Sequence, residues 1–76
     1  MALIGEFKYK PMERNSLHKE IPAFYTIFER DQAVFVQINT RGTDDRQIPD
    51  KTSQSIQLDR KGAEQLVKIL RDAFHL

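Results

Sequence analysis

The residue types best suited to chemistry in this 76-residue chain are phenylalanines, amides and arginines, which alternate with aliphatic residues between positions 24 and 41. Aromatic rings can stack on nucleobases, at roughly 1–3 kcal/mol per base. Amides can hydrogen-bond to base edges, and arginines can contact phosphates. The segment therefore predicts a surface for single-stranded nucleic acid. The stacking and base-edge candidates are Phe24, Phe28, Phe35, Gln37 and Asn39, and the phosphate candidates are Arg30 and Arg41.

Four further basic residues could widen this surface. Lys8 and Lys10 are expected on the outward side of a first strand, where they would extend a positive rim. Arg46 and Lys51 belong to a long polar loop that could close over a bound strand. In a competing interpretation, the phenylalanines pack under a neighbouring segment or across a dimer interface, and the basic side chains are simply solvated.

Residues for catalysis or metal binding are sparse. The chain has two histidines, His18 and His75, and no cysteine, so neither a nucleophile–base pair nor a thiolate zinc site is indicated. Asp44, Asp45 and Asp50 do not follow the spacing of a calcium-binding loop. Three glycines in all do not form a phosphate-binding loop. We therefore expect a domain that is not an enzyme and needs no cofactor.

Size and charge narrow the class of protein further. A chain of 76 residues is expected to form a single domain, residues 1–76, and to bury only about 60% of its unfolded surface. Dimerisation would supply the missing buried area. The formal net charge of +1 argues against indiscriminate binding through bulk charge. No apolar run approaches the ~18 residues of a membrane span, and no signal peptide is apparent. A cytoplasmic location is expected, associated with the nucleoid if the chain binds DNA.

Alternating residue patterns place these side chains on a sheet. Residues 24–30 and 33–41 predict a hairpin with a two-residue turn at Asp31-Gln32, which pairs Phe28 with Phe35. The alternate side chains of the hairpin would then face a core. Further strands are expected at 3–9 and 53–58, joined by a polar linker (14–22) and the polar loop (42–52). The core-facing residues of the hairpin would be Tyr25, Ile27, Val34, Val36 and Ile38.

The C-terminal segment predicts an amphipathic helix. Asp59 is a suitable N-cap, and the apolar residues after it recur at i, i+3, i+4 and i+7. Ile69 and Leu76 widen the apolar stripe, which indicates a second partner surface. The expected fold is α+β, with an antiparallel four-stranded sheet followed by one C-terminal helix (ββββα), in a homodimer joined through that helix. The stripe consists of Ala63, Leu66, Val67, Leu70, Ala73 and Phe74.

Three pieces of the chain share a pattern with a known family. They are the hairpin, the polar loop that ends at Thr52, and the sequence Ser55-Ile56-Gln57-Leu58-Asp59 that leads into a helix with spaced leucines. Together, over about residues 23–72, they resemble the PC4-like family of single-stranded-DNA-binding transcriptional coactivators. In place of the family's usual basic-glycine pair before Ile-x-Leu, this chain has Gln54-Ser55.

The resemblance carries its own expectations about structure and function. It implies a four-stranded antiparallel sheet, a C-terminal helix, a homodimer joined largely through the helices, and single-stranded DNA lying on the sheets. A transcription or replication accessory factor is the expected function. A protein–protein adaptor that uses the aromatic face or the helix stripe is the alternative. The positions to which the resemblance transfers a nucleic-acid role are Arg30, Phe35, Gln37, Arg41 and Lys51.

Overall fold

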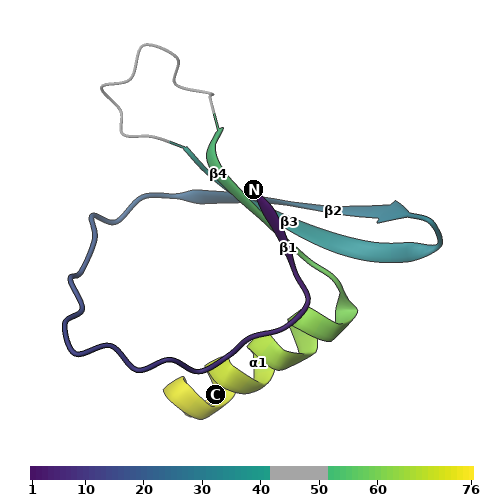
Figure 1. The fold of residues 1–76 in the computed structure, drawn as a ribbon. Coiled ribbons are helices and arrows are strands. Elements are labelled where there is room, and N and C mark those ends of the chain that lie inside the picture. The colour runs from purple at the N-terminus through teal and green to yellow at the C-terminus, as the bar shows by residue number, and fades with distance from the viewer. Residues whose placement is uncertain (42–51) are drawn as a thin grey trace.

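The computed structural model describes residues 1–41 and 52–76 of the chain. One four-stranded sheet and one helix make up the fold, which confirms the expected α+β class (Figure 1). The strands lie in the order β1-β4-β3-β2. The elements are β1 (Ala2–Ile4), β2 (Ala23–Arg30), β3 (Ala33–Arg41), β4 (Thr52–Leu58) and α1 (Arg60–Phe74).

The sheet is mixed, so the expectation of a purely antiparallel sheet is wrong. β2, β3 and β4 are antiparallel neighbours, whereas β1 runs parallel to β4, with Ala2 opposite Ile56 and Ile4 opposite Leu58. Residues 5–22 pass along α1 and return in a wide arc to the start of β2, at the opposite edge of the sheet (Figure 1). With this long connection, no tight turn fixes the direction of β1.

The β2–β3 hairpin has the predicted turn and register. Arg30 pairs with Ala33 across the turn, and Phe28 pairs with Phe35. Asp31 and Gln32 have φ angles of 53° and 65°, both in the left-handed region. Two successive left-handed residues define a type I′ turn, whose twist matches that of the flanking strands. The turn therefore fixes which side chains share a face.

The register of β3 against β4 separates an apolar face from a polar one. Val36 lies opposite Leu58 and Ile38 opposite Ile56, whereas the intervening pairs consist of amides and a serine. Val36, Leu58 and Ala63 line a common hollow, so α1 begins beneath the apolar side of the sheet. We call this side the apolar face and the opposite side the open face. Phe28 and Phe35 belong to the open face, as predicted.

Helix α1 begins and ends with the expected local chemistry. The Asp59 carboxylate accepts a hydrogen bond from the Gly62 N–H at 2.7 Å, which confirms the predicted N-cap. At the other end, His75 adopts a left-handed conformation and the Leu76 N–H donates to the Arg71 carbonyl at 3.2 Å. Gly62 is buried, and a Cβ atom there would overlap the Ile4 carbonyl oxygen. The absence of a side chain lets α1 start directly against β1.

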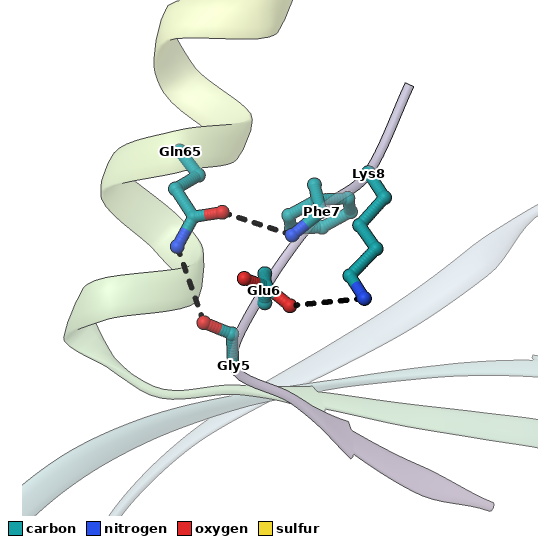
Figure 2. Close-up of polar contacts among 5 residues, drawn as sticks. All are labelled: Gly5, Glu6, Phe7, Lys8 and Gln65. Atoms are coloured by element: carbon teal, nitrogen blue, oxygen red, sulfur yellow. Dashed lines mark hydrogen bonds and ion pairs between the residues drawn. The ribbon is translucent and has the colours of Figure 1, made fainter. Parts of the chain in front are cut away.

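The chain that leaves β1 is tied to α1 by one glutamine (Figure 2). Gln65 accepts from the Phe7 N–H at 2.9 Å and donates to the Gly5 carbonyl at 3.1 Å. These bonds direct residues 5–8 along the helix, which is why the first strand ends at Ile4 and the prediction of a strand over 3–9 is wrong. Lys8, which contacts Glu6 at 3.7 Å, and Lys10 are therefore not on β1, contrary to the prediction.

The single chain has little core of its own. Within the described part of the chain, Leu58, at 6% exposure, is the one buried apolar side chain. Tyr25 and Ile27 point to the apolar face yet are 73% and 64% exposed. The Cα radius of gyration is 14.7 Å, against about 11 Å for a compact domain of this length. Much of the apolar face is thus left uncovered by the helix of its own chain.

Candidate functional site

The open face combines aromatic, amide and arginine side chains from β2, β3 and β4 with one leucine from β1. By register, each strand presents alternate residues to this side. None of these residues in the described strands is acidic, because Glu29 belongs to the apolar face. The open-face residues are Leu3 on β1, Phe24, Thr26, Phe28 and Arg30 on β2, Ala33, Phe35, Gln37, Asn39 and Arg41 on β3, and Ser55 and Gln57 on β4.

Two aromatic groups lie along the β2–β3 ribbon. Near the hairpin turn, the rings of Phe28 and Phe35 are stacked, with centroids 5.4 Å apart and planes inclined by 23°. At the other end of β2, the guanidinium carbon of Arg41 lies 3.9 Å from the centroid of the Phe24 ring. This is cation–π geometry. Phe24 and Phe28 are four residues apart on an extended strand, about 13 Å, so the groups can contact successive parts of one extended ligand.

A hydrogen-bonded amide network lies on β3 and β4 beside the rings. Gln57 Nε2 donates to Gln37 Oε1 at 2.8 Å, and Gln37 Nε2 donates to Asn39 Oδ1 at 3.0 Å. Ser55 Oγ donates to the same Asn39 oxygen at 2.6 Å. Each amide is thereby held in one orientation. In the described part of the chain, Asn39 Nδ2 and Gln57 Oε1 make no hydrogen bond. The network thus orients the Asn39 amide nitrogen, a donor, and the Gln57 amide oxygen, an acceptor, for contact with a ligand.

The surroundings of the network suit contact with a planar polar group. A recess of 230 Å³ is lined by Leu3, Gln37, Ser55 and Gln57, together with the first two residues of the chain. Ser55 is 8% exposed, and the glutamines are half-buried. Among the described residues, every buried side-chain nitrogen and oxygen has a hydrogen-bond partner. The recess therefore combines an apolar wall with oriented amides.

The structure brings together five of the nine predicted binding residues. Phe28, Phe35, Gln37 and Arg41 share the open face, and Arg30 joins them by register at the hairpin end. Lys8 and Lys10 lie on the segment that follows β1 and do not extend the sheet. Arg46 and Lys51, with the predicted polar loop, lie outside the described residues.

Sequence reasoning missed the part of the open face that Ser55, Gln57 and Leu3 form beside the amide network. Ser55 and Gln57 alternate with the core-side residues of β4, and this alternation was the signal that could have identified them. Leu3 pairs with Gln57 because β1 joins the sheet in parallel next to β4, and no local pattern reveals that pairing. The amide network as a whole depends on the register of β3 against β4, which pairs residues 16 to 20 positions apart in the sequence.

In residues 1–41 and 52–76, no group of three or more His, Cys, Asp or Glu side chains could hold a metal ion. No helix in the same ranges has the length and apolar character needed to cross a bilayer.

Comparisons with protein-family models, curated proteins and solved structures yielded no match for this chain. The candidate site is therefore defined by its own geometry: stacked rings, an arginine over a ring and oriented amides on the open face of the sheet.

Proposed function

We propose that this chain is a non-enzymatic domain that binds single-stranded nucleic acid on its open face, as an accessory factor in transcription or replication. The observation that carries the proposal is the placement of both aromatic groups and the amide network on the side of the sheet opposite α1. Single-stranded nucleic acids are bound by such aromatic platforms because every base has a face that can stack.

Each group on the open face has a distinct role in the proposal. Bases stack against the Phe28–Phe35 pair and against Phe24, and the guanidinium of Arg41 supports its ring while contacting phosphate. Arg30 supplies a second phosphate contact near the turn. The Asn39 amide nitrogen and the Gln57 amide oxygen bond to base edges, which is the chemistry that gives sequence preference.

The modest charge of the chain predicts a shallow salt dependence. Each neutralised phosphate of a single strand contributes about −0.7 to the slope of log K against log salt concentration. Two arginine contacts per chain, from Arg30 and Arg41, therefore predict a slope of about −1.4 per bound protomer. A slope several times steeper would indicate binding through many dispersed cations and would argue against a confined aromatic site.

The direct test is a fluorescence-anisotropy titration of labelled oligothymidine at low salt. We expect saturable binding at or below about 10 µM protein. The double variant Phe35→Ala/Arg41→Ala should bind at least about tenfold more weakly, because it loses one stacking ring and one phosphate contact. The matched control, Tyr9→Ala/Arg14→Ala, removes the same residue classes from the exposed segment 5–22 and should bind like the parent. Absence of binding by the parent protein rejects the proposed function.

The proposal includes self-association through α1. Val67, Leu70 and Phe74 form one stripe, and all three are exposed in the single chain, Phe74 at 67%. A second copy of the helix would cover this stripe symmetrically.

A protein–protein adaptor is the second candidate function. The exposed apolar face favours it, since Tyr25, Ile27 and Val34 form an uncovered apolar surface of the kind that binds proteins. The titration separates the candidates, because an adaptor should show no salt-dependent affinity for oligothymidine.

A further inference from the structure

The outer edge of β2 is an unusually unprotected strand edge. β2 lies at one end of the sheet order, and no strand of the described part of the chain pairs with its outer side. Natural edge strands are commonly kept short or protected by lysine, proline or a bulge. β2 has eight residues, its register with β3 is unbroken, and its charged residues are confined to Glu29 and Arg30 at the end.

The hairpin turn determines which backbone groups of β2 point away from the sheet. A two-residue type I′ turn is closed by a hydrogen-bonded pair, here Arg30 and Ala33, and such pairs then alternate along an antiparallel ribbon. The even-numbered residues of β2 therefore direct their N–H and C=O groups toward β3. The residues that direct these groups outward are Ala23, Tyr25, Ile27 and Glu29.

The sequence of β2 is close to symmetric about Thr26. Phenylalanines stand two positions away on each side, and large apolar residues, Tyr25 and Ile27, stand one position away. A two-fold symmetric contact needs a self-complementary surface, which this pattern provides. We propose that β2 pairs antiparallel with β2 of a second copy of this chain, about a two-fold axis at Thr26, through the outward backbone groups.

This register accounts for side chains that the fold leaves uncovered. Tyr25 would lie opposite Ile27 of the second copy on the apolar face, covering side chains that are 73% and 64% exposed. Phe24 would lie opposite Phe28 of the second copy on the open face, so the aromatic groups of two chains become continuous.

The contact differs from the α1 contact and does not rest on nucleic-acid binding. Because the backbone groups of Thr26 point toward β3, the Thr26 pair at the axis is of the non-hydrogen-bonded type, with Cα atoms about 4.5 Å apart. That separation lies within the range of a disulfide, about 4.4–6.8 Å. The chain has no cysteine, so a single substitution introduces one thiol and allows a clean test.

The first measurement is the rate of intermolecular disulfide formation by Thr26→Cys under mild oxidation, without nucleic acid. Ala33→Cys is the matched control, since Ala33 is an exposed open-face residue one strand further from the proposed axis. We expect Thr26→Cys to cross-link at least about tenfold faster than Ala33→Cys. Equal rates overturn the proposal.

The second measurement is amide hydrogen exchange of the unaltered chain, which tests the proposal even if the cysteine variant does not fold. Amide hydrogen exchange at Tyr25 and Ile27 should slow as protein concentration rises, whereas Phe24, Thr26 and Phe28 should be protected at every concentration by their bonds to β3. A self-associated protein in which the Tyr25 and Ile27 amides still exchange rapidly overturns the proposal. At about 1 mM protein, any contact with a dissociation constant below about 1 mM would be populated. A protein that is still monomeric at this concentration also overturns the proposal.

Discussion

At the residue scale, the clearest structural constraint falls on Gly62. It lies in the first turn of α1. Glycine has a lower helix propensity than alanine, by about 1 kcal/mol in a helix interior. Its position is explained by contact rather than propensity, because any Cβ atom would overlap the backbone carbonyl of Ile4. Backbone atoms of a paired strand cannot move aside as a flexible side chain can.

Gly62→Ala should therefore destabilise the protein despite the better helix propensity of alanine. The added methyl group would force α1 away from β1, and overpacking of this kind lowers the free energy of unfolding by about 1–3 kcal/mol. Urea unfolding at fixed protein concentration measures the change. Gly5→Ala is the control, since a Cβ there would meet only Lys61 and Asp59 side-chain atoms at 3.5–3.8 Å. If the two substitutions had equal effects, close approach of α1 to β1 would not be the reason for Gly62.

The N-cap offers a second test at the residue scale. Asp59→Ala removes the acceptor that Gly62 N–H uses at 2.7 Å and should lower the free energy of unfolding by about 1 kcal/mol. Asp59→Ser, which keeps a capping oxygen, should recover most of that loss in the same urea experiment. A serine variant as unstable as the alanine variant would show that capping is not the role of Asp59.

At the scale of elements, the β2–β3 turn has type I′ geometry, but its second residue, Gln32, is an unfavourable type for that position. Asp31 and Gln32 are both left-handed, a conformation that is about 1–2 kcal/mol unfavourable for residues with a Cβ. Gln32→Gly should raise the free energy of unfolding by up to about 1 kcal/mol, with the entropy of glycine offsetting part of the gain. Thermal unfolding measures this, and a lower stability in the glycine variant would contradict the type I′ assignment.

The elements that sequence analysis predicted correctly are those with local signals. The hairpin register follows from a two-residue turn between alternating strands, and α1 follows from Asp59 and the spacing of its apolar residues. β1 was placed wrongly because its limits depend on a parallel partner more than fifty residues away and on Gln65. The same long-range contacts explain why Lys8 and Lys10 were misplaced and why Leu3 was not placed beside Gln57.

At the scale of the whole molecule, the single chain is extended and weakly packed. Its radius of gyration is 14.7 Å, and the described part has one buried apolar side chain, so much apolar surface is left exposed by the chain's own packing. The two proposed self-contacts use different surfaces, the stripe of α1 and the edge of β2. A chain with two distinct two-fold contacts can close as a tetramer of D2 symmetry.

The α1 contact predicts the behaviour of a single helix variant. Phe74→Glu should weaken self-association at least tenfold, about 1.4 kcal/mol, because it places a charge in the proposed interface. Lys68→Gln, which also lowers the net charge by one but lies on the polar side of α1, should have little effect. Sedimentation equilibrium over a range of concentrations distinguishes them, and equal association of both variants would exclude α1 from the interface.

The central claim, that single-stranded nucleic acid binds the open face, is tested most directly by the side-chain amide resonances of ¹⁵N-labelled protein. On addition of unlabelled oligothymidine, the NH₂ signals of Gln37, Asn39 and Gln57 should shift, because these amides border the proposed site. Those of Gln54, on the apolar face, and Gln65, on α1, should not. Shifts confined to Gln54 and Gln65, or no shifts at saturating oligonucleotide, would contradict the account.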